Sequence, residues 1–199
     1  MISECDMCEG SGRYQRVIMG IDPGTNVMGY GVLGISDRKP ELVVMGVLKL
    51  NGFDHYLRLA RIYERVSSLV AQYLPDELAI EAPFFGKNVQ SMLKLGRAQG
   101  VAMAAALARE VPIAEYAPLK IKQAVTGSGS ASKERVAEML RRLLSIPEDK
   151  MPHLLDATDA LAAALTHYYE SLKPDLPRGP KSWEQFIAAN PDRIAPRRK

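Results

Sequence analysis

The stretch VIMGIDPGTNVMGYGVLGI, residues 17–35, decides how the fold begins. It holds two apolar runs rich in β-branched residues, separated by Asp-Pro-Gly-Thr-Asn at positions 22–26. Runs of this kind form strands, and a cluster of Pro, Gly and Asn marks the turn between them. The stretch therefore predicts a β-hairpin with Asp22 at the end of its first strand.

Apolar runs and helical spacing extend the hairpin into a complete domain. A third strand is expected at residues 41–50, which makes an antiparallel meander, and two more at 78–82 and 112–116. Helices are expected at residues 53–73, 88–110, 118–125, 132–144 and 154–171. Three strands followed by alternating helices and strands predict an α/β fold, with a mixed five-stranded sheet and helices on both faces.

The composition fits one globular domain with additional sequence at both ends. The chain has 199 residues, of which 47% are apolar and 25% charged, and this excludes disordered and collagen-like classes. We expect an N-terminal extension at 1–16, a folded domain at 17–173 and a basic, Pro-rich tail at 174–199. Because no apolar run reaches the roughly 20 residues of a membrane span and no signal peptide is recognisable, we expect a soluble, cytoplasmic protein with no membrane partner.

Charge is distributed unevenly along the chain, although the net charge is only +3. Residues 87–142 carry 10 basic and 4 acidic side chains, whereas residues 1–86 carry 8 and 11, and residues 143–173 carry 2 and 5. A basic surface beside an acidic pole suits a metal-dependent enzyme that acts on a polyanion. Chance segregation of solvated charge would give the same counts.

Four carboxylates interrupt apolar patterns. Asp22 and Glu81 each end a predicted strand, and Asp156 and Asp159 are spaced i, i+3 in the Ala- and Leu-rich last helix. If they converge, they form a cluster with no Arg or Lys nearby in sequence, and divalent cations would neutralise its charge. Oxygen ligands favour Mg²⁺ or Mn²⁺ over Zn²⁺. Each acid taken singly could instead cap a turn or face solvent.

Several motifs resemble those of the RuvC family of Holliday-junction resolvases and follow one another in the same order along the chain. They are GIDPGT at 20–25, GYGV at 29–32, AIE at 79–81, LKLGRAQG at 93–100, EYAP at 115–118, KQAVTGSGSASK at 122–133 and DATDALAAALTH at 156–167. The resemblance implies an RNase-H-like fold and a homodimer that nicks two opposed strands of a four-way DNA junction. It also implies two Mg²⁺ ions per site, with Mn²⁺ as a substitute, and the RuvA and RuvB branch-migration proteins as partners.

The resemblance also assigns residues to the metal site and to DNA. Asp22, Glu81, Asp156 and Asp159 match the family's metal-binding catalytic acids. Phe84 matches its junction-stacking aromatic, whereas the adjacent Phe85 is expected to anchor the loop in the core. Lys122 and Lys133 match lysines near the scissile strand. Lys87 is a further candidate for DNA binding, and weaker candidates for the electrostatic footprint are Lys94, Arg97, Arg141 and Arg142.

Three other functions compete with the junction nuclease. The DPGT turn also resembles the phosphate turn of actin-like ATPases, but those need a second lobe and a second such turn. An RNase-H-type nuclease acting on RNA/DNA hybrids is the closer alternative. A non-catalytic junction-binding scaffold is expected to have lost one or more of the four acids, and none is missing.

Some segments have an open interpretation. The Ala-rich stretch at 98–108 suits a dimer interface as well as packing on the sheet. Cys5 and Cys8 have the spacing of a zinc half-site, but one copy supplies two of the four ligands that zinc needs, so an extension without metal is expected. We interpret His153 as a loop or helix-start residue.

Overall fold

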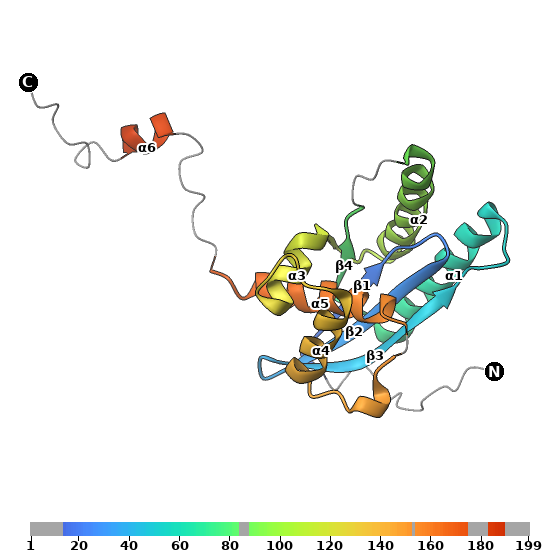
Figure 1. Ribbon diagram of the computed structural model, residues 1–199, viewed down its shortest axis with the longest axis horizontal. Coiled ribbons are helices and arrows are strands. Elements are labelled where there is room, and N and C mark those ends of the chain that lie inside the picture. Colours follow the sequence, from blue (N-terminus) through green and yellow to red (C-terminus); the bar gives the residue numbers. More distant parts are fainter. Residues whose placement is uncertain (1–13, 84–87, 153, 175–182, 190–199) are drawn as a thin grey trace, which may run out of the picture.

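A computed structural model of the chain describes residues 14–83, 88–152, 154–174 and 183–189. A sheet with helices on both faces dominates these residues (Figure 1). None of the helices in this part of the chain is long and apolar enough to cross a membrane.

The sheet has five strands in the order β3-β2-β1-β4-β5. They are β1 (Arg16–Asp22), β2 (Val27–Ser36), β3 (Lys39–Lys49), β4 (Glu77–Glu81) and β5 (Ile113–Tyr116). The first three strands are antiparallel neighbours, and β4 and β5 join them in parallel to β1. The predicted mixed sheet is therefore confirmed. The third strand starts at Lys39 rather than Glu41, because Asp37 and Arg38 have φ of 51° and 61° and form a tight hairpin turn.

Helices cover both faces of the sheet, as predicted. The helices that cover it are α1 (His55–Tyr73), α2 (Val89–Leu107), α3 (Pro118–Thr126), α4 (Lys133–Leu143) and α5 (Asp156–Ser171). The described residues also form a 3₁₀ turn at Glu148–Lys150 and a short helix, α6 (Trp183–Ala189). Side chains of α1 and α2 share one buried cluster with Met19 and Ile21, whereas those of α3, α4 and α5 share another with Ile18 (Figure 1). The second predicted helix ends at Leu107 instead of Glu110, which adopts a left-handed φ of 59°.

Glycines on β1 and β2 allow α5 to approach the sheet closely. A Cβ atom added to Gly20 would lie 2.0 Å from the backbone oxygen of Ala160, and one added to Gly29 would lie 1.9 Å from that of Asp156. Gly20 pairs with Gly31 across the two strands, so the helix crosses a glycine-lined part of the sheet. Only a residue without a side chain permits this approach.

We predict that Gly20→Ala lowers the free energy of unfolding by about 1 to 3 kcal/mol or more, because the methyl group overlaps the α5 backbone. Gly96→Ala in α2 is the matched control, since nothing lies within 4 Å of its added Cβ. A helical Gly→Ala change of this kind should stabilise by about 0.5 to 1 kcal/mol. Urea unfolding of both variants measures the two effects, and equal stability of Gly20→Ala and the wild type would contradict this packing.

Candidate active site

Three aspartates meet where β1 ends and α5 begins. Oxygen atoms of Asp22, Asp156 and Asp159 all lie within 4.8 Å of one another. Asp22 is paired across the strands with Gly29, and the backbone of Asp156 packs directly on that glycine. Asp156 and Asp159 occupy the first turn of α5, where the helix dipole favours negative charge. The glycine contact thus brings the helix acids to the strand acid.

Glu81 lies next to this cluster without joining it. It ends β4, which runs parallel to β1 with Ile80 beside Ile21. Burial and the negative charge of Asp159 raise the pKa of the Glu81 carboxyl from 4.5 to about 7. The structure therefore brings three of the four predicted acids together and places the fourth within electrostatic reach of them.

A lysine lies among the acids, although no Arg or Lys is near them in sequence. Lys133, the first residue of α4, contacts the carboxylate of Asp159, and its Nζ lies 3.9 Å from Asp156. Its side chain is 51% exposed, whereas that of Asp159 is 12% exposed. Lys122 on α3 also stabilises the ionised forms of Glu81 and Asp159. Both predicted lysines therefore lie at the acidic cluster.

The electrostatics of the cluster fit a divalent cation. Burial, followed by the charges of Glu81 and Asp159, raises the pKa of Asp22 well above its ordinary value. Burial also raises the pKa of Asp159, although its hydrogen bond with Lys133 opposes the shift. Burial alone would lower the pKa of Lys133, but the bond and charge of Asp159 raise it. Repulsion of this kind is relieved when oxygen ligands share a cation, so the residues present suit such an ion.

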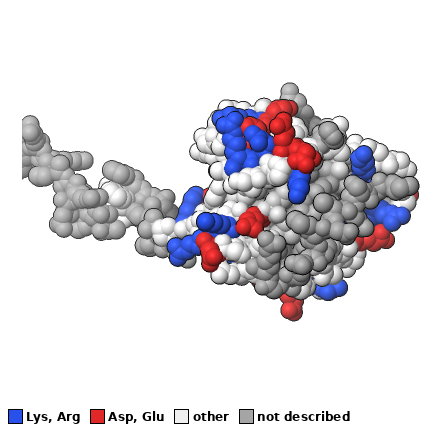
Figure 2. All heavy atoms as spheres, turned by 90° about the horizontal axis from the view of Figure 1, so that it is seen from below, with Lys and Arg blue, Asp and Glu red and all other residues white. Residues whose placement is uncertain are grey.

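Most of the other predicted positions either lie outside the described residues or form ion pairs with nearby carboxylates. Phe84, Phe85, Lys87, His153, Cys5 and Cys8 lie outside the described residues. Arg141 and Arg142, weaker candidates for DNA binding, both bind the carboxylate of Glu138, at 2.9 and 2.5 Å. Figure 2 shows that basic and acidic side chains alternate on the face that it presents. Part of the basic charge counted at residues 87–142 is therefore paired with carboxylates, at Lys120, Lys133, Arg141 and Arg142.

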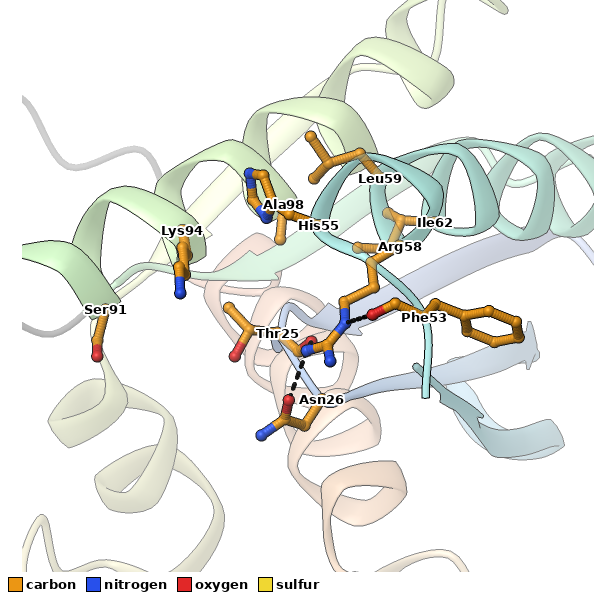
Figure 3. A pocket seen from close by; sticks show the side chains of 10 residues that line it. All are labelled: Thr25, Asn26, Phe53, His55, Arg58, Leu59, Ile62, Ser91, Lys94 and Ala98. Carbon is orange, nitrogen blue, oxygen red and sulfur yellow. Dashed lines mark hydrogen bonds between the residues drawn. The ribbon is translucent and has the colours of Figure 1, made fainter. Parts of the chain in front are cut away.

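Arg58 of α1 was not predicted to have a role near the acids. Its guanidinium donates to the backbone oxygen of Phe53 at 2.8 Å, to that of Thr25 at 2.7 Å and to Oδ1 of Asn26 at 2.6 Å (Figure 3). It thus fixes the turn that follows Asp22. Three acceptors from two loops are brought together only by the fold, so no sequence pattern would have found them.

The raised pKa of Glu81 predicts a pH-dependent stability in EDTA. Between about pH 4.5 and 7 the native carboxyl keeps a proton that the unfolded chain has lost, so stability falls as the pH rises. Glu81→Gln removes this titration. From pH 4.5 to 8 the variant should therefore gain on the order of 3 kcal/mol of unfolding free energy relative to the wild type.

Urea unfolding at a series of pH values measures this difference. Glu64→Gln is the control, because Glu64 lies on the surface of α1 in an exposed pair with Arg61, and it should follow the wild type. A wild type and a Glu81→Gln variant with parallel pH profiles would show that Glu81 is not protonated by its surroundings.

Comparisons with known proteins agree with this geometry. The family model described as Crossover junction endodeoxyribonuclease RuvC matches residues 18–167. Proteins of that name from Bacteroides fragilis and Porphyromonas gingivalis are 60% and 58% identical to this chain, covering 90% of it and 96% and 97% of their own lengths. The structure described as T. thermophilus RuvC in complex with Holliday junction substrate is 35% identical, with a TM-score of 0.72 over 79% of this chain and 95% of that one. This chain belongs to the RuvC family of crossover junction endodeoxyribonucleases.

Proposed function

We propose that this protein is an endonuclease that resolves four-way DNA junctions by paired, symmetric nicks, in homologous recombination and DNA repair. The observation that carries the proposal is the cluster of Asp22, Asp156 and Asp159, whose oxygens lie within 4.8 Å in a chain of this family. A homodimer would carry two such clusters, one for each of the two opposed strands. The proposed location is the cytoplasm. The branch-migration proteins RuvA and RuvB are the partners that the family resemblance suggests.

We assign the metal site to Asp22, Glu81, Asp156 and Asp159, with two Mg²⁺ ions and with Mn²⁺ as a substitute. Divalent ions bound there would activate water towards a phosphodiester and stabilise the leaving oxygen. The carboxylates supply hard oxygen ligands, and Asp22 and Glu81 have pKa values raised by burial and by neighbouring acids. An ion that holds them deprotonated at neutral pH offsets this cost.

The proposed DNA contacts lie around this cluster. Lys122 and Lys133 are assigned to the scissile strand, because both influence the acids and the side chain of Lys133 is half exposed. Phe84 is assigned to stacking on a base at the junction, and Lys87 to a nearby phosphate, on the family resemblance alone. The division into an extension at 1–16, a nuclease domain at 17–173 and a tail at 174–199 is likewise part of the proposal.

Neutral amides at the acids test the metal site and the function together. Asp22→Asn, Asp156→Asn, Asp159→Asn and Glu81→Gln should each nearly abolish cleavage of an end-labelled mobile four-way junction in Mg²⁺. Junction binding in EDTA should persist. Wild-type protein should give paired, ligatable nicks that EDTA abolishes. Cleavage confined to RNA/DNA hybrids would instead indicate the RNase-H-type alternative, and full activity of Asp22→Asn would remove Asp22 from the site.

The lysines are tested with a neighbour on the same helix as control. Lys133→Ala and Lys122→Ala should slow cleavage, and loss of a phosphate contact should also reduce the salt slope of binding by about one. Lys120→Ala removes the same charge two residues from Lys122, at a side chain that pairs with Glu170 at 3.0 Å, and should behave like the wild type. If both active-site variants cleave at the wild-type rate, neither lysine belongs to the site.

A further inference from the structure

A polar pocket lies beside the turn that follows Asp22. Its volume is about 320 Å³, and it lies between that turn and the N-terminal halves of α1 and α2 (Figure 3). Thr25 borders it from the turn, His55 and Arg58 from α1, and Ser91 and Lys94 from α2. We call it the turn pocket. It shares no lining residue with the acidic cluster, although both are attached to the same turn.

Positive charge gathers at the turn pocket without acidic partners. Arg58 and Lys94 line it, and Nη1 of Arg97 lies 3.3 Å from Nε2 of the lining residue His55. Within the described ranges, no carboxylate oxygen lies within 4.0 Å of the side-chain nitrogens of Arg58, Lys94 or Arg97. These cations therefore differ from Arg141 and Arg142, which share Glu138.

Hydrogen-bond donors in the turn pocket remain available to a ligand. Nε and Nη1 of Arg58 donate to backbone and amide oxygens, but among the described residues Nη2 donates to no protein acceptor. Lys94 contributes an ammonium group on an exposed side chain, and Ser91 a hydroxyl group. Guanidinium, ammonium and hydroxyl groups are the donors that proteins use for the phosphates of nucleic acids.

We propose that the turn pocket binds a backbone phosphate of the DNA strand that lies in the candidate active site. The inference rests on the proposed function, because it takes junction DNA as the ligand. Asp22 and Thr25 are three residues apart, a span of at most about 10 Å. Phosphates of one strand advance about 3.4 Å each along a duplex. A phosphate bound beside Thr25 is therefore expected within about three nucleotides of the bond that is cleaved.

Lys94 is the best residue for a test of the pocket. Its side chain is exposed, and among the described residues it has no ion pair that its replacement would remove. Lys94→Ala should reduce the salt slope of junction binding by about 0.9, which corresponds to about eightfold weaker binding at 0.1 M salt. Fluorescence anisotropy in EDTA, with salt varied, measures both quantities. Lys39→Ala removes an equal charge from an exposed side chain at the far end of the sheet from Asp22, and should leave the slope unchanged.

Junctions with single methylphosphonates identify the phosphate itself. Neutralising one phosphate within three nucleotides of the cut should weaken wild-type binding several-fold but leave Lys94→Ala unaffected. Wild-type binding that fails altogether would overturn the proposed function and this inference with it. Normal wild-type binding, with an unchanged slope in Lys94→Ala or with no methylphosphonate position coupled to Lys94, would overturn the turn pocket alone.

Discussion

The close contact between α5 and the glycines of β1 and β2 is the constraint on which the candidate site depends. A side chain at Gly20 or Gly29 would overlap the α5 backbone, so the helix would have to move away from the sheet. Asp156 and Asp159 would move with it, because both belong to its first turn. Metal ligands must be held to within a few tenths of an ångström. A shift of α5 away from the sheet by more than this would separate its two acids from Asp22. The glycines of the GIDPGT and GYGV motifs thus serve the geometry of the site as much as the packing of the core.

The side chains around the two ends of α5 differ in how completely their charges are paired. Near its C-terminus, Arg16 pairs with Glu77, and Lys120 and Lys173 both pair with Glu170, so these charged groups have partners of opposite sign. At its N-terminus, four acids from three elements face two ammonium groups, that of Lys133 in direct contact and that of Lys122 through its charge. Clustered acids without an equal number of cations repel one another and cost stability. The excess of acids at the end of the sheet where Asp22 and Glu81 lie therefore indicates a site for cations.

The strands, the helices and the positions of the acids at their ends could be predicted from the sequence, because each depends on spacing within a single element. The contacts that could not be predicted are those between distant elements. Lys133 precedes Asp156 by 23 residues and reaches the cluster only because α4 packs beside α5. The hydrogen bonds of Arg58 could not be predicted for the same reason, since its acceptors belong to loops that only the folded chain brings together. The pairing of Arg141 and Arg142 with Glu138 is different, because residues spaced i, i+3 and i, i+4 are neighbours on a single helix and their spacing alone predicts such ion pairs.

The turn after Asp22 links the acidic cluster to the turn pocket mechanically. Arg58 donates hydrogen bonds to Thr25 and Asn26, so the turn is fixed to α1 only a few residues beyond Asp22. A strand held by its phosphate in the pocket would therefore be held at a set distance from Asp22. Phosphodiester hydrolysis needs the reacting phosphate placed to within a fraction of an ångström, and a second anchor on the same rigid turn reduces the freedom of the strand to slide. In the proposed function the acids hold metal, but their charge repels the phosphates of the strand to be cleaved. Cations beside the same turn would supply the attraction that the acids cannot, and would leave the acids available for metal.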